Sequence, residues 1–128
     1  MDKELLVNSD IQAGKKLVEV LDKSKFLLEG ALWFYSSESA EWHLLLVTKL
    51  VDIIGPKKAY IIVWEALNDL RSEIGFSLER ISVLSPKDKL IQLLRKAIRT
   101  DKGISEIRFS KNTINGVFIE DAFIYRLT

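Results

Sequence analysis

The sequence predicts a single α+β domain in which a mostly antiparallel sheet of about five strands packs with three helices. Three observations support this class. Stretches of helical periodicity alternate with short aliphatic and aromatic runs, most of those runs occur in pairs joined by short polar turns, and no linker or composition break divides the 128 residues. We expect the order α-β-β-α-β-α-β-β within one domain spanning residues 1–128, of which residues 1–8 are flexible.

The first helix is predicted from a capping signal followed by an apolar stripe. Ser9-Asp10-Ile11-Gln12 has the Ser-x-x-Gln form of a capping box. Gly14 falls inside the stripe, where glycine costs about 1 kcal/mol of helix propensity. We therefore expect the helix backbone to approach the sheet closely at Gly14. The stripe consists of Ile11, Gly14, Leu17, Val18 and Leu21.

Two further helices are predicted from proline at a first helical position. Gly55-Pro56 starts the second helix, which ends near Gly75. Ser85-Pro86-Lys87-Asp88 starts the third helix, with Ser85 as its N-cap, and this helix ends near Asp101. The apolar stripe of the second helix is Ala59, Tyr60, Val63, Ala66, Leu67, Leu70 and Ile74, and that of the third is Leu90, Leu94, Ala97 and Ile98.

The strands are predicted as two hairpins and one single strand. Residues 31–35 and 42–47 pair across a short polar turn, and residues 81–84 form the single strand. Asn115-Gly116 is a strong signal for a type I′ turn closing the last hairpin. A two-residue loop sets the register, which pairs Ile114 with Val117, Lys111 with Glu120, Phe109 with Ala122, and Ile107 with Ile124.

Both faces of the predicted sheet are apolar, whereas a half-solvated sheet alternates apolar and polar residues. Leu32 and Phe34 point to one face, and Trp33 and Tyr35 point to the other. In the last hairpin, one face carries Ile107, Phe109, Phe118, Ala122 and Ile124, and the opposite face carries Ile114, Val117, Ile119, Phe123 and Tyr125. Three helices with single stripes cover about one face. Either one helix crosses to the second face, or a partner protein or ligand covers it.

The second helix also carries apolar residues away from its stripe. Ile61 and Ile62 point away from the stripe, and Trp64 lies at its rim. Contiguous exposed apolar residues indicate a partner or a ligand. The predicted contact surface, which fits a homodimer or another protein partner, comprises Trp33, Tyr35, Phe123 and Tyr125 on the sheet, and Ile61, Ile62 and Trp64 on the helix.

Charge is unevenly distributed along the chain. The formal net charge is +1, but residues 87–111 contain eight basic and three acidic residues, a net charge of +5. A basic helix face of this kind fits a nucleic-acid backbone or an acidic protein, and it is equally typical of an ordinary solvated face. The anion-binding candidates on the third helix are Lys89, Arg95, Lys96 and Arg99.

Few residues support catalysis. The absence of cysteine excludes disulfides, thiolate chemistry and iron–sulfur clusters. His43, the single histidine, has Glu41 two residues before it on the same strand face, but no Gly-x-Ser-x-Gly nucleophile motif accompanies it. Asp101 and Glu106-Ile107-Arg108 are weakly similar to the carboxylate pattern of magnesium-dependent nucleases. No cofactor and no metal ligand set is predicted.

The leading hypothesis is a small, soluble, non-enzymatic protein-interaction module that is homodimeric and regulates or neutralises a partner protein. One alternative is a small-molecule or anion-binding domain, and another is a metal-dependent nuclease using Asp101 and Glu106. No apolar run reaches the roughly 18 residues of a membrane span, and the N-terminal residues lack a secretory pattern. We therefore expect a cytoplasmic protein that does not insert into membranes.

Overall fold

A five-stranded mixed sheet in the order β3-β2-β1-β5-β4 forms the centre of the computed structural model, which describes residues 4–70 and 73–128. Only β2 and β3 run parallel, so the predicted α+β class and mostly antiparallel sheet are confirmed. The strands are β1 (Leu28–Ser36), β2 (Glu41–Thr48), β3 (Ile81–Leu84), β4 (Ile107–Ile114) and β5 (Val117–Leu127). The helices are α1 (Asn8–Lys23), α2 (Leu50–Ile54), α3 (Pro56–Asp69) and α4 (Lys89–Ala97), with a 3₁₀ turn, η1 (Leu78–Arg80).

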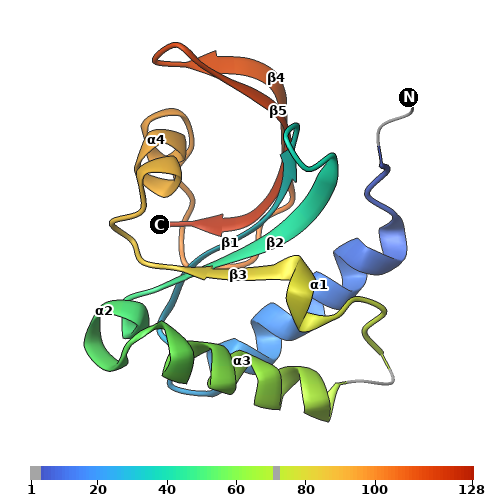
Figure 1. The fold of residues 1–128 in the computed structure, drawn as a ribbon, viewed down its shortest axis with the longest axis vertical. Helices are drawn as coiled ribbons and strands as arrows, with labels where there is room; N and C mark the ends of the chain where they lie inside the picture. Colours follow the sequence, from blue (N-terminus) through green and yellow to red (C-terminus); the bar gives the residue numbers. More distant parts are fainter. Residues whose placement is uncertain (1–3, 71–72) are drawn as a thin grey trace.

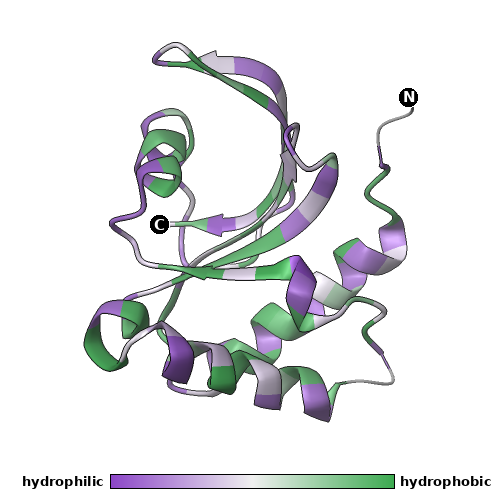
Figure 2. Cartoon of the chain, viewed as in Figure 1, coloured by the Kyte–Doolittle hydropathy of each residue, from purple (hydrophilic) through white to green (hydrophobic). Residues whose placement is uncertain are grey.

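Helices cover both faces of the sheet. Helices α1 and α3 lie on one side and α4 lies on the other (Figure 1). Trp33, Tyr35 and Tyr125 belong to the core under α1 and α3, whereas Leu32 and Ile124 belong to the core under α4. Hydrophobic colour dominates the strands between the helices, and the helices themselves alternate hydrophobic and hydrophilic bands (Figure 2). The second apolar face is therefore covered within the monomer by a helix that crosses to it.

The start of α1 differs from the predicted capping box. Val7 occupies the N-cap position without a side-chain cap, and Ser9 lies inside the helix. Residues preceding the helix are anchored, because Glu4 accepts hydrogen bonds from the backbone N–H and indole Nε1 of Trp42, at 3.1 and 2.8 Å. This anchoring brings the chain into the helix at Asn8, too early for Ser9 to act as a cap. Glu4 is thus held against β2, and residues 1–3 lie outside the described residues.

The third predicted helix begins later than the sequence indicates. Asp88 is its N-cap, and its carboxylate accepts from the backbone N–H groups of Leu90 and Ile91. Ser85 instead closes the preceding turn, where its hydroxyl accepts from the N–H of Lys87 at 3.0 Å and donates to Asp52 at 2.7 Å. The helix ends at Ala97, so residues 98–103 form a connecting segment beside β5.

The second predicted helix begins at Pro56 as expected, but it ends at Asp69 rather than near Gly75. A separate short helix, α2, precedes it and was not predicted. Gly55 joins the two helices with φ of 88°, a backbone conformation that favours glycine.

The turn of the last hairpin is confirmed. Asn115 and Gly116 have φ of 48° and 80°, as a type I′ turn requires, and Ile114 pairs with Val117. The predicted pairs of Phe109 with Ala122 and Ile107 with Ile124 are also present, but Lys111 and Glu120 are not paired in the ladder, and Lys111 adopts φ of 50°.

The sheet faces of the hairpin also differ from the prediction beyond Lys111. Ile114 and Ile119 pack with Ala122 and Ile124 in the core under α4, although their alternation had predicted the opposite face. Side chains alternate strictly only where every residue is extended, and Lys111 is left-handed, so the predicted face was wrong for Ile114 and Ile119.

Gly14 confirms the predicted close approach of α1 to the sheet. A Cβ atom at this position would lie 2.4 Å from the hydroxyl oxygen of Tyr125 and 2.9 Å from the indole nitrogen of Trp33. Both partners are buried and fixed, so the helix can reach this depth only where no side chain projects.

We predict that Gly14→Ala destabilises the protein by about 2 kcal/mol or more, because overpacking outweighs the gain of about 1 kcal/mol in helix propensity. Urea unfolding followed by circular dichroism measures the change. Gly75→Ala is the matched control, since a Cβ there meets nothing within 4 Å. Equal stability of the two variants would contradict the close approach.

Candidate functional site

Three of the four aromatic residues predicted on the sheet surface lie inside the protein. Trp33 is 0% exposed, Tyr35 and Tyr125 are also buried, and Phe123 is half-buried. The Trp33 ring meets Phe76 edge-on at 4.9 Å between ring centroids. These three buried residues cannot form an exposed contact surface, and the prediction is wrong for them because α1 and α3 cover this face.

Trp33 and Tyr125 instead form a buried polar relay that ties the sheet to α1. The indole Nε1 of Trp33 donates to the hydroxyl of Tyr125 at 3.0 Å, and that hydroxyl donates to the carbonyl of Ile11 at 2.6 Å. Burial raises the pKa of the Tyr125 phenol above its ordinary value, so the phenol stays protonated and able to donate. The role of these aromatics is therefore structural.

We predict that Tyr125→Phe lowers the free energy of unfolding by about 1–3 kcal/mol, because it leaves the buried Trp33 indole and the Ile11 carbonyl without their partner. Chemical denaturation with tryptophan fluorescence measures the loss. A variant as stable as the wild type would show that the relay contributes nothing.

The helix part of the predicted contact surface remains accessible. Ile61 is 45% exposed and Trp64 is 54% exposed, and they lie one turn apart on α3. Ile62 is half-buried against the core. Beside Trp64 is an open groove of about 240 Å³, here called the α3 groove, lined by Trp64, Leu67, Asn68, Ile74, Phe76, Ser77 and Leu78.

The predicted anion-binding residues do not share one face. Lys89, Lys96 and Arg99 are exposed, but Arg99 lies beyond the end of α4. Arg95 is half-buried; its guanidinium donates to the carbonyl of Pro86 at 3.3 Å and lies 3.8 Å from the carboxylate of Glu29. Arg95 is thus directed toward the protein, and the exposed basic face of α4 is reduced to its lysines.

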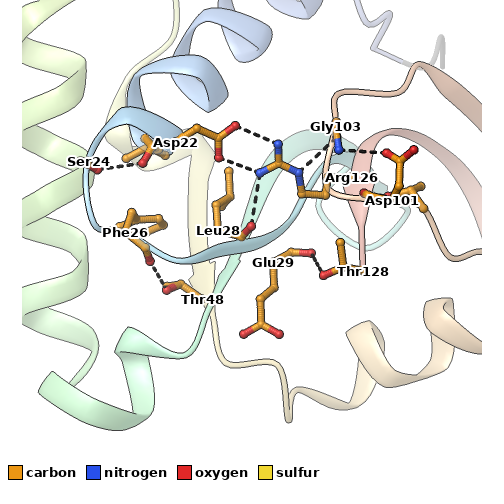
Figure 3. A network of polar contacts seen from close by, with 12 residues as sticks. Asp22, Ser24, Phe26, Leu28, Glu29, Thr48, Asp101, Gly103, Arg126 and Thr128 are labelled. Atoms are coloured by element: carbon orange, nitrogen blue, oxygen red, sulfur yellow. Dashed lines mark hydrogen bonds and ion pairs between the residues drawn. The ribbon is translucent and has the colours of Figure 1, made fainter.

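A second depression, of about 520 Å³, lies where β1 begins and β5 ends and is here called the charged groove. The buried guanidinium of Arg126 forms paired hydrogen bonds with Asp22, at 2.7 and 2.8 Å, and it also donates to the carbonyls of Gly103 and Leu28 (Figure 3). The lining residues are Asp22, Leu27, Leu28, Glu29, Lys49, Lys102, Arg126 and Thr128.

The sequence analysis did not predict the charged groove, although the position of Arg126 in the sequence indicates a buried ion pair. It lies between Tyr125 and Leu127 in a stretch, residues 122–127, that is otherwise apolar, and a buried cation there needs an acidic partner. The sequence does not show that the partner is Asp22, because the two residues are 104 positions apart.

We predict that Asp22→Asn destabilises the protein by about 3 kcal/mol, because it leaves the buried Arg126 guanidinium without its carboxylate. Thermal or urea unfolding measures the change. Glu73→Gln is the control, since the exposed Lys16–Glu73 pair should contribute under about 1 kcal/mol. Similar losses in both variants would contradict this assignment.

The candidate catalytic residues are held in local contacts. His43 Nε2 lies 3.4 Å from the Glu41 carboxylate on the outer part of β2. Arg108 forms two hydrogen bonds of 2.7 Å with Asp121, which raise the pKa of its guanidinium, and the Asp101 carboxylate accepts from the N–H of Gly103 at 2.9 Å. Within residues 4–70 and 73–128, no three or more histidine, aspartate or glutamate side chains are grouped to hold a metal ion.

No helix in the described part of the chain is both long and apolar enough to cross a membrane. Comparisons with protein-family models, curated proteins and solved structures found no match. Function is therefore inferred from the accessible surfaces.

Proposed function

We propose that this protein is a non-enzymatic interaction module whose contact surface is the exposed edge of α3, formed by Ile61, Trp64 and the α3 groove. The observation that carries the proposal is the position of Trp64, a large aromatic side chain exposed at the mouth of an apolar groove. Tryptophan is enriched among the residues that contribute most to binding, and Ile61 extends the apolar surface by one turn. A cytoplasmic setting belongs to the proposal, since a chain without cysteine needs no disulfide-forming compartment.

The partner that fits this surface is a second copy of the chain. Helix α3 has exposed Lys57 and Lys58 in its first turn and exposed Glu65 and Asp69 in its C-terminal half, on either side of the apolar centre. In a two-fold interface the same patch meets itself in reverse. Two antiparallel α3 helices would therefore bring the lysines of each copy toward the carboxylates of the other.

Sedimentation velocity over a series from low to high micromolar concentration tests the proposal. We expect the average mass to rise from 14.7 kDa toward that of a dimer, and the double variant Ile61→Ser, Trp64→Ala to remain at 14.7 kDa. Phe118→Ala is the control, because Phe118 is also exposed but lies in β5, near the turn of the last hairpin. A wild type that stays monomeric throughout, or equal weakening by the control, overturns the second copy as partner.

Charge reversal tests the antiparallel arrangement separately. The variant Lys57→Glu, Lys58→Glu and the variant Glu65→Lys, Asp69→Lys should each self-associate more weakly than the wild type, because like charges then face each other. A mixture of the two variants should recover association as a heterodimer. Failure of the mixture to associate more strongly than either variant alone contradicts the arrangement.

A further inference from the structure

The charged groove has the size of a small-molecule site, and its lining residues differ from those of the contact surface on α3. Its volume of about 520 Å³ lies within the range of ligand pockets, which is roughly 300–1,000 Å³. Five of its eight lining residues are charged, and Leu27 and Leu28 supply its apolar part. We propose that the charged groove binds a small organic anion whose acidic headgroup lies between Lys49 and Lys102 and whose apolar body lies against Leu27 and Leu28.

The charges around the groove leave a net positive rim. Asp22 and Arg126 neutralise each other at close range, and the other charged lining residues, Lys49, Lys102 and Glu29, carry a net charge of +1. Lys49 and Lys102 are exposed and form no ion pair within the described residues. Two unpaired ammonium groups at the edge of a depression attract anions and raise their local concentration.

The backbone that carries Lys102 is held firmly against β5. Thr100 and Leu127 exchange two hydrogen bonds of 2.8 Å, one through the Thr100 hydroxyl. One residue past Lys102, the Gly103 N–H donates to Asp101, and the Gly103 carbonyl accepts from Arg126. Because these contacts are made within the chain itself, binding needs little ordering of the chain.

The position of Lys49 is fixed as well. Thr48 is fully buried, and its hydroxyl donates to the carbonyl of Phe26 at 2.5 Å and accepts from the N–H of Leu50 at 3.1 Å. Lys49 is also the N-cap residue of α2. The two lysines therefore approach the groove from rigid backbone on separate elements.

The apolar wall contains an unusual residue. Leu27 is 53% exposed and adopts φ of 58°, a left-handed conformation that bulky residues rarely occupy. It is held there because buried Phe26 precedes it and Leu28, which follows, pairs with Thr48 in the sheet. Strain of this kind persists where the surroundings impose it and is common at ligand sites.

Glu29 determines which way the ligand lies. One oxygen of its carboxylate is buried without a hydrogen-bond partner, and the other is 3.8 Å from Arg95, beyond hydrogen-bond length. A carboxylate that is not tightly paired repels an acidic headgroup from its side of the groove. The headgroup is consequently directed to the lysines, and the apolar body to the leucines.

A matched series of four-carbon probes tests this assignment: butyl phosphate, butyrate, butanol and butylammonium. Amide NMR shifts of isotope-labelled protein report where each probe binds. We expect saturable shifts at residues 27–29, 49 and 102 with butyl phosphate, butyrate or both, and none with butanol or butylammonium. The stronger anion identifies the headgroup as phosphate or carboxylate. No saturable shift from either anion up to about 10 mM overturns the proposal.

Paired variants separate a defined site from general attraction to a basic surface. Lys49→Gln, Lys102→Gln should weaken anion binding about tenfold, as expected for the loss of two partly exposed charge contacts. Lys89→Gln, Lys96→Gln on α4 removes the same charge elsewhere and should leave binding unchanged. Equal weakening by both pairs overturns the site. The Ile61→Ser, Trp64→Ala variant should bind the anion as the wild type does, so this result is independent of dimer formation.

Discussion

The structure depends on covering a sheet that is apolar on both faces. Trp33, Tyr35 and Tyr125 face one way and Leu32 and Ile124 the other, so neither face can be left in water. Helices cover both faces: α1 and α3 pack on one face, and α4 packs on the other (Figure 1). Gly14 lets α1 lie directly over the Trp33–Tyr125 pair, and the hydroxyl of that tyrosine bonds to α1 itself.

A register shift in the sheet supports the same contact. Between Ala31 and Leu32 the pairing of β1 with β5 skips Tyr125, which therefore has no opposite residue. Its carbonyl accepts instead from the N–H of Ser105 at 2.6 Å, and this bond fastens the segment after α4 along β5. The irregularity that positions the tyrosine under α1 thus also helps to hold the loop bearing Lys102 beside the charged groove. The register shift in the core therefore helps to set the position of Lys102 on the surface.

The packing of the helices against the sheet also determines which of their apolar residues remain exposed. Helix α3 buries Ala59, Val63 and Ala66 against the sheet, which leaves Ile61 and Trp64 on its outer edge. The apolar surface proposed for contact is consequently a helix edge with an adjoining groove, rather than a broad aromatic sheet face. Such a surface fits a small interface with an apolar centre and a charged rim. The lysines at the start of α3 and the carboxylates in its C-terminal half would face each other if two copies of the helix packed antiparallel.

The sequence by itself determined the fold class, the strand pairing in both hairpins and the close approach of α1 to the sheet at Gly14. Each of these follows from a local signal, namely alternation, turn residues, or a glycine within an apolar stripe. It also identified Ile61 and Trp64 as lying off the apolar stripe of their helix. Only the tertiary structure decided that Trp33, Tyr35 and Tyr125 are buried, that Arg95 turns toward Glu29, and that Asp22 and Arg126 meet. Packing between segments far apart in the chain decides which helix covers which face and which distant charges pair. Local sequence patterns do not contain that information.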